Sequence, residues 1–181
     1  SSLQEAEIPL LGDVNGKSIL HLQCHFGQDS LSLARMGAKV TGADISDKAI
    51  EQATAFATQL DIDASFVVAD VYDLPSRLHA NFDIVFASYG VLGWLPDMER
   101  WAQVVQHFLK PGGKLVLVEF HPAVWMLDDD FNKITYNYFN KEAIIEDTVG
   151  TYAQTDAPIN NKSISWNHSL SEVMGSLLQL G

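Results

Sequence analysis

The chain has 181 residues, of which 47% are hydrophobic and 19% charged, and this length suits one domain with a sizeable core. Its net charge of −12 and its 11 scattered Lys and Arg residues disfavour a nucleic-acid partner, because phosphate binding needs clustered basic side chains. We also expect neither a membrane span nor a signal peptide, and the single cysteine, Cys24, fits a reducing cytoplasm.

Apolar runs alternate with helical patterns along the first two thirds of the chain. The expected strands lie at residues 17–22, 38–44, 65–70, 82–88 and 114–120. The expected helices lie at residues 30–36, 47–60 and 98–109. Asp29 and Ser46 are the predicted caps of the first two helices, and Gly37 ends the first.

These strands are apolar throughout rather than at every second residue, so helices must cover both faces of their sheet. The pattern predicts an α/β fold with a doubly wound, mostly parallel sheet and helices on both faces. Ligands of such folds bind at the carboxyl ends of the strands, near the point where the strand order reverses.

The region 121–166 differs in composition, being rich in aromatic, Asn and Asp residues without helical periodicity. Within a single domain spanning 1–181, we expect it to form an irregular or extended insertion over the carboxyl edge of the sheet. A capping box from Ser169 to Glu172 then predicts a last helix. No further strand follows, so we expect a fragment or a chain that lacks the final strands.

Chemically suggestive residues follow three of the expected strands. The first group is the loop in "ILHLQCHFGQDS", from Gln23 to Gly27. Asp44, about 20 residues past the first strand, could accept both hydroxyls of a ribose, and Asp70 could face an adenine amino group. Each has a structural alternative: a turn glycine, a helix N-terminus at Asp44, and a carboxylate that binds the amides of its own loop at Asp70.

The ordered combination of a strand, a glycine loop, a helix and two further strands that each end in Asp indicates a cofactor site more specifically than any one of these features does. The stretch from Lys17 to Phe120 resembles class I S-adenosylmethionine-dependent methyltransferases, through "ILHLQCHFG", "SYGVLGWLPD" and "FLKPGGKLVLVEF". The segment "CHFGQDSLSLARMGA" resembles a bacterial subgroup of largely unassigned substrate. The resemblance implies a Rossmann-like methyltransferase fold. Members of the family finish the sheet with an antiparallel hairpin, which we expect this chain to lack.

The resemblance also implies the residues that hold the cofactor. Gly27 matches the last glycine of the first motif, Gln23 and His25 replace the other two, and His21 stands where an acid often holds the cofactor's amino group. The full set of implied cofactor-binding residues is His21, Gln23, His25, Gly27, Asp44, Ile45, Asp70, Val71, Ser88 and Tyr89.

The altered loop argues more strongly against NAD than against S-adenosylmethionine. A pyrophosphate must approach the backbone of this loop closely, which a side chain at His25 would block. S-adenosylmethionine has no phosphate, and its carboxylate could be met by backbone donors or by Gln23.

Transfer of an activated methyl group mainly needs proximity, alignment and exclusion of water, and a base only where the acceptor must lose a proton. His121 is the first candidate base and His25 the second, with a structural histidine as the alternative for each. Trp94, Trp125 and Tyr136 could line an acceptor pocket or pack in the core. The run 128–130 predicts a solvated loop, and we expect no metal.

The sequence therefore predicts S-adenosylmethionine-dependent methyl transfer to a small-molecule acceptor by a cytoplasmic monomer or homodimer, with no nucleic-acid or membrane partner. Two alternatives stay open. One is a non-catalytic methyltransferase-like protein that binds the cofactor, and the less favoured one is an NAD-dependent oxidoreductase.

Overall fold

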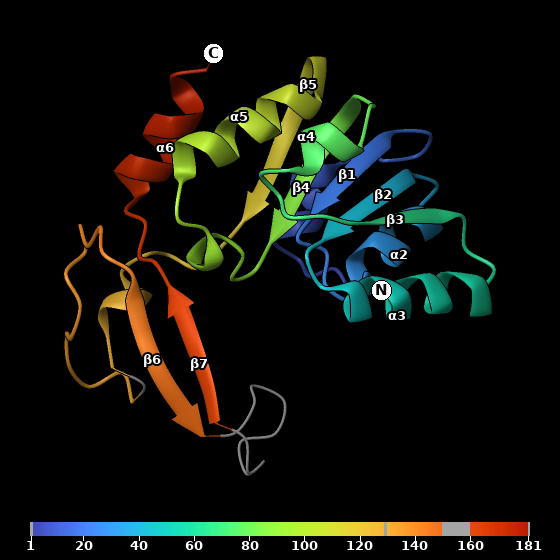
Figure 1. Cartoon of the computed structure of the whole chain (residues 1–181). Helices are drawn as coiled ribbons and strands as arrows, with labels where there is room; N and C mark the ends of the chain where they lie inside the picture. The colour runs from blue at the N-terminus through green and yellow to red at the C-terminus, as the bar shows by residue number, and fades with distance from the viewer. Residues whose placement is uncertain (1, 129, 150–159, 181) are drawn as a thin grey trace. The chain divides into compact units, whose positions relative to one another are not determined.

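The computed structural model describes residues 2–128, 130–149 and 160–180 of the chain (Figure 1). The chain divides into two compact units. The first, here called the sheet unit, comprises Ser1–Tyr89 and Arg100–Val118. The second, the hairpin unit, comprises Gly90–Glu99 and Glu119–Gly181.

The sheet unit contains five parallel strands in the order β3-β2-β1-β4-β5 (Figure 1). Their bounds are β1 (Ser18–Leu22), β2 (Lys39–Asp44), β3 (Ala64–Val68), β4 (Phe82–Ser88) and β5 (Leu109–Val118). The strand order reverses between β1 and β4, which confirms the predicted doubly wound α/β fold. The carboxyl ends of these two strands flank the position where ligands of such sheets bind.

Helices connect the strands, as the sequence pattern requires. They are α1 (Glu7–Leu11) ahead of the sheet, then α2 (Gln28–Arg35), α3 (Asp47–Gln59), α4 (Leu74–Arg77) and α5 (Met98–Phe108). Right-handed crossovers place α2 and α3 on one face of the sheet and α4 and α5 on the other.

Burial of apolar side chains explains why these segments form strands and helices. The central strands are nearly inaccessible to solvent, with Ile19, Leu20 and Phe86 all 0% exposed. One core cluster joins α1, α2 and four strands; it comprises Leu3, Leu11, Val14, Ile19, Leu33, Ala38, Val40, Ile84, Phe86 and Val116. The N-terminal segment is therefore part of the sheet unit's core.

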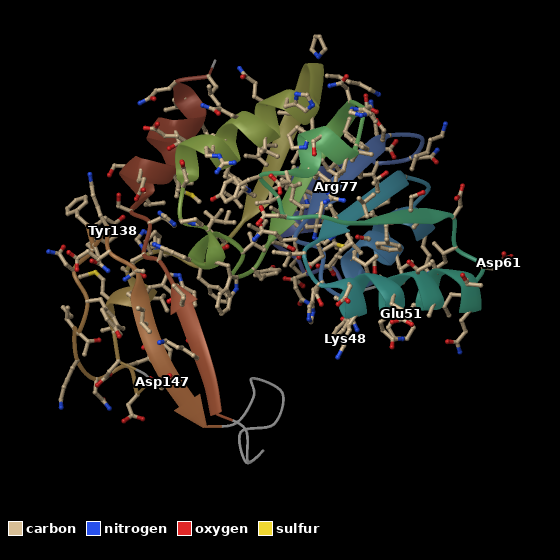
Figure 2. The ribbon with its side chains drawn as sticks, viewed as in Figure 1. Lys48, Glu51, Asp61, Arg77, Tyr138 and Asp147 are labelled. Atoms are coloured by element: carbon tan, nitrogen blue, oxygen red, sulfur yellow. The ribbon has the colours of Figure 1, made fainter. Side chains whose placement is uncertain are left out.

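Helix α3 shows how a surface helix meets this sheet. Ser46 caps it by accepting a hydrogen bond from the Ala49 N–H at 3.2 Å, as predicted. Ala49 and Ala53 are buried, whereas Lys48 and Glu51 are exposed and point away from the sheet (Figure 2). The amphipathic spacing of the sequence thus sets which side of α3 packs.

Several element ends differ from the sequence prediction. Gly27, with φ 69°, is the N-cap of α2, so the assignment of that cap to Asp29 is wrong and Asp29 lies in the first turn. Strand β5 begins at Leu109 and ends at Val118, with a register shift between Phe82 and Ile84, rather than spanning 114–120. The helices α1 and α4 were not predicted, because five and four residues are too few to show helical periodicity.

In the hairpin unit, β6 (Ile144–Val149) pairs antiparallel with β7 (Asn160–Ser165) in a sheet of their own. The unit also holds the 3₁₀ turns η1 (Leu92–Trp94) and η2 (Val124–Met126) and the helix α6 (Leu170–Leu178). Both strands fall within the region expected to contain extended segments. The expectation that the chain lacks an antiparallel hairpin is therefore wrong, although these two strands do not join the five-stranded sheet. The predicted location of this region over the carboxyl edge stays a prediction.

The predicted last helix is capped by Ser169, whose Oγ accepts a hydrogen bond from the Glu172 N–H at 3.2 Å, one of the two hydrogen bonds of the predicted capping box. In the part of the chain that the structure describes, no helix is long and apolar enough to cross a membrane.

Candidate functional site at the carboxyl edge of the sheet

Alternate residues of the loop between β1 and α2 have left-handed backbone conformations. Gln23, His25 and Gly27 have φ angles of 53°, 49° and 69°. Glycine adopts such angles easily, whereas other residues do so at a cost of roughly 1 kcal/mol. Gln23 and His25 therefore keep a backbone conformation suited to glycine while adding side chains to the loop.

Gly27 itself is required by space as well as by conformation. A Cβ atom at this position would lie 2.7 Å from Phe66 Cε1 and 2.9 Å from the Ala53 Cβ. Gly42 on β2 has the same neighbour, since its Cβ would lie 2.7 Å from Phe66 Cδ1 and 2.8 Å from Cys24 Sγ. Phe66 of β3 thus packs where two glycines leave room, and this brings the loop close to the sheet.

Asp44, the last residue of β2, joins two loops. One carboxylate oxygen accepts a hydrogen bond from the His25 N–H at 2.8 Å, and the other accepts one from the Ser46 N–H at 2.9 Å. The half-buried carboxylate keeps a second lone pair on each oxygen for further donors. Asp44 therefore binds the backbone at the N-terminus of α3, which is its structural alternative. Both of its oxygens can still accept further hydrogen bonds at the sheet edge.

Asp70, after β3, makes the local contact that the sequence left open. Its Oδ1 accepts a hydrogen bond from the Tyr72 N–H at 2.8 Å. This bond closes an Asx-turn, in which the side-chain oxygen takes the place of a backbone carbonyl. Asp70 and the following Val71 are both half-buried. Ile45, after β2, is 69% exposed and thus available to contact a ligand.

His21 on β1 is a buried, uncharged group. It is 3% exposed, and its Nδ1 lies 2.8 Å from the Ser30 Oγ. Burial lowers the pKa of His21 to about 4, although the nearby Asp29 and Asp44 carboxylates act in the opposite direction. His21 is therefore neutral at pH 7 and does not replace the negative charge of an acid at this position.

Cys24, in the same loop, is also kept uncharged. It is 5% exposed. Burial, and to a smaller extent the nearby Asp44 charge, raise the pKa of the thiol to about 12. A thiol is a weak nucleophile until it loses its proton. This agrees with leaving Cys24 out of the catalytic residues.

The end of β4 brings Tyr89 beside an acid that the sequence analysis missed. Tyr89 follows Ser88 with φ 53°, and its N–H donates to the Val118 carbonyl at 2.8 Å. Partial burial raises the pKa of Tyr89, and hydrogen bonding to the Glu7 carboxylate adds to the shift. Glu7 lies on α1 and is 0% exposed. The only sequence signal for it was an acid within the apolar stretch "EIPLL".

The remaining predicted residues belong to the hairpin unit. The Nδ1 of His121 accepts a hydrogen bond from the Ala123 N–H at 3.2 Å, the structural role weighed as the alternative, and the residue is exposed. Trp94 and Trp125 are 59% and 42% exposed, which argues against core packing. Tyr136 is half-buried and donates to Glu146 at 3.0 Å.

Glu119, directly after β5, organises the hairpin unit's own loop and was not anticipated. Its two oxygens accept hydrogen bonds from four backbone N–H groups, those of Gly90, Val91, Leu92 and Phe120. A carboxylate with several amide donors is strongly held in one orientation. Glu119 thereby fixes the segment that follows Tyr89 in the chain.

A cavity of about 600 Å³ lies within the hairpin unit. Trp166 and His168 line it, together with acids that include Glu99 and Glu172. Neither Trp94, Trp125 nor Tyr136 is among its lining residues. Across residues 2–128, 130–149 and 160–180, no group of three His, Cys, Asp or Glu side chains is arranged to hold a metal ion. Asp129 lies outside the described residues.

The sheet order, the left-handed loop after β1 and the acids at the ends of β2 and β3 define a Rossmann-like domain, a class of fold that binds its ligands at the carboxyl edge of the sheet. The family model described as "Methyltransferase domain" matches residues 19–113, more than half of the chain. The chain belongs to this family, as the resemblance predicted.

Two curated relatives illustrate the similarity. A ubiquinone biosynthesis O-methyltransferase from Xanthomonas oryzae is 31% identical over 117 residues, which cover 64% of this chain and 48% of the relative. An uncharacterized methyltransferase from Synechocystis is 34% identical over 113 residues, covering 61% and 51%. The matched segments thus span about half the length of these curated relatives.

Solved structures share the fold. An S-adenosylmethionine-dependent methyltransferase from Mesorhizobium loti aligns with a TM-score of 0.67 and 19% identity, covering 96% of this chain and 77% of that one. Magnesium protoporphyrin IX methyltransferase from Synechocystis, solved with bound S-adenosylmethionine, aligns with a TM-score of 0.59 and 18% identity, covering 97% and 64%. The predicted Rossmann-like methyltransferase fold is confirmed.

Proposed function

We propose that this protein transfers a methyl group from S-adenosylmethionine to a small-molecule acceptor. The observation that carries the proposal is Asp44, which ends β2 with both oxygens directed to the loops around the sheet edge and with lone pairs left for a ribose. Membership of the methyltransferase family supports the same activity.

The residues at the carboxyl edge fit S-adenosylmethionine by the chemistry of their donors and acceptors. Asp44 would accept the ribose hydroxyls, with Ile45 beside it, and Asp70 with Val71 would flank the adenine. We assign the methionine end to the loop after β1 and the end of β4; this set comprises His21, Gln23, His25, Gly27, Ser88 and Tyr89. Within it, His21 acts as a neutral hydrogen-bonding group.

The cofactor, when bound, supplies a methyl group already activated on a positively charged sulfur. What the chain contributes is binding, alignment and exclusion of water around the acceptor. His121, and after it His25, stay proposed as the base that takes a proton where the acceptor must lose one. Trp94, Trp125 and Tyr136 stay proposed as acceptor-binding residues, and the exposure of the two tryptophans supports a ligand-facing role.

Hydroxyl-bearing acceptors are the first class to screen, because curated relatives carry the name O-methyltransferase. We propose a cytoplasmic monomer or homodimer.

The replacement of two loop glycines by Gln23 and His25 motivates the second candidate, a methyltransferase-like protein that binds the cofactor without catalysis. Release of S-adenosylhomocysteine in the presence of an acceptor would separate the two.

The proposal is tested by calorimetric titration with S-adenosylhomocysteine, the demethylated product. We expect Asp44→Ala to weaken binding by about 1 to 3 kcal/mol, because charge-assisted hydrogen bonds to the ribose are lost. The control is Asp47→Ala, which removes an exposed carboxylate three residues further on. Equal affinities for wild type and Asp44→Ala would exclude Asp44 from the site.

A further inference from the structure

Glu7 is an acid in an unusual place within the sheet unit. Its side chain is 0% exposed, although carboxylates are almost never fully buried without a partner. The Oε2 accepts a hydrogen bond from the Gln4 N–H at 2.9 Å, while the Oε1 has no hydrogen-bond partner among the described residues. No Lys, Arg or His of the described chain forms an ion pair with it.

Such an arrangement is unfavourable in the isolated chain. One oxygen of this buried carboxylate has no hydrogen-bond partner, and no opposite charge of the described residues pairs with the group, so the acid carries a large desolvation penalty. A core position on α1 could hold an apolar side chain instead, as Leu11 does at 1% exposure. The buried acid is thus poorly explained by packing alone, and a ligand that brings a positive charge and N–H donors would satisfy it.

The surroundings of Glu7 belong to the proposed cofactor site. Its carboxylate is hydrogen-bonded to the phenol of Tyr89, the residue that follows β4, and the charge of Asp29 in the first turn of α2 also raises the pKa of that phenol. The ends of β1 and β4 flank the point where the strand order reverses. His21, at the end of β1, is neutral, so it offers no competing negative charge. The acids at the two other strand ends, Asp44 and Asp70, have local amide donors.

S-adenosylmethionine contains one group that matches this carboxylate. Its ribose and adenine are neutral, whereas its amino-acid portion carries an α-ammonium group with three N–H donors and a positive charge. A carboxylate and an ammonium group form a charge-assisted hydrogen bond, which is strong when both are shielded from water.

We infer that Glu7 is the anionic subsite for the α-ammonium group of the cofactor. The inference rests on the proposed function and adds a specificity-determining residue to it. Glu7 discriminates between ligands with and without an ammonium group, whereas Asp44 and Asp70 act on the nucleoside part that both kinds of ligand share.

The test is a calorimetric comparison of three probes: S-adenosylhomocysteine, its deaminated analogue with hydrogen in place of the ammonium group, and 5′-methylthioadenosine. We expect the wild type to bind S-adenosylhomocysteine about 10 to 100 times more tightly than the deaminated analogue. Glu7→Gln, which keeps the shape and removes the charge, is expected to abolish that preference and to leave binding of 5′-methylthioadenosine unchanged.

Glu5→Gln is the matched control, because it removes an exposed carboxylate from the same N-terminal segment and is expected to bind all three probes as the wild type does. Equal affinity of the wild type for S-adenosylhomocysteine and its deaminated analogue would overturn the inference, with or without a folded Glu7→Gln variant. A full preference retained in folded Glu7→Gln would also overturn it. Failure of the wild type to bind any of the probes would instead refute the proposed function on which the inference rests.

Discussion

The two units of the chain build their strands in different ways. In the sheet unit, Ile19 and Leu20 are neighbours on β1 and point to opposite faces, yet both are 0% exposed. In the hairpin unit, Ile145 and Ile164 are paired across β6 and β7 but are 57% and 45% exposed. A strand buried on both faces is apolar at most positions, whereas a largely exposed hairpin places few demands on its residues.

The units resemble each other in how they hold their loops. Asp44 ends β2 and accepts hydrogen bonds from the backbone of two loops of the sheet unit. Glu119 follows β5 and accepts hydrogen bonds from the segment 90–92 of the hairpin unit. In both units, one carboxylate at the end of a strand holds the backbone of nearby loops. The contrast between the units lies in how their apolar side chains are buried.

The largest expected effect comes from the same substitution made once in each unit. Ile19→Ala is expected to lower the free energy of unfolding by about 3 to 4 kcal/mol, because it opens a cavity beneath the sheet. Ile164→Ala should cost less than about 1 kcal/mol, because much of that side chain already contacts water. Urea unfolding followed by circular dichroism measures both.

Equal losses of unfolding free energy in the two isoleucine variants would contradict this contrast, since they would mean that the hairpin unit packs as tightly as the sheet unit.

The second contrast uses glycines. Gly27→Ala is expected to destabilise the chain by about 2 to 4 kcal/mol, because its Cβ would overlap Phe66 and because the residue has a positive φ. Gly175→Ala in α6 has open space around it and should stabilise that helix by about 0.5 to 1 kcal/mol. The midpoints of thermal unfolding would show the opposite signs.

A Gly27→Ala variant as stable as the wild type would show that Phe66 can move aside, and the loop after β1 would then be less constrained than the structure indicates.

The third and smallest expected effect concerns a buried histidine that is neutral in the native chain. The native pKa of His21 is about 4, below the usual 6.5, so between these values the unfolded chain binds a proton that the native chain does not. The free energy of unfolding should therefore fall by up to about 3 kcal/mol as the pH drops from 6.5 to 4. Comparing wild type and His21→Gln across this range isolates the contribution of the imidazole.

Ser30→Ala serves as the control for this pH dependence, because it removes the hydroxyl near Nδ1 but leaves a titratable, buried His21. An NMR titration of His21 with a midpoint near 6.5 would contradict the expected shift.

The parts of the site predictable from sequence are those that follow strands. Asp44 and Asp70 were identified because a strand's last residue lies at the carboxyl edge whatever the details of packing. Their amide contacts were anticipated as alternatives for the same reason, since they are made within a few residues of the chain. The bond from the His25 N–H to Asp44 joins two loops and was not foreseen.

The residues that sequence reasoning missed have distant partners or short elements. Glu7 lies on a five-residue helix that shows no periodicity, and its importance comes from Tyr89, far along the chain. Glu119 gains its role from backbone amides that precede it by almost thirty residues. Asp29 was placed wrongly as a cap, because its residue type favours caps, while Gly27 takes the position through its left-handed backbone.

The parallel sheet, its alternating helices and the strand ends that carry chemistry follow from local sequence patterns, because continuous apolar runs can be buried in few other ways. Tertiary structure alone decided the burial of Glu7, the neutral state of His21 and the room that Gly27 leaves for Phe66. These properties depend on which distant groups displace water from a side chain, and local sequence patterns do not specify those neighbours.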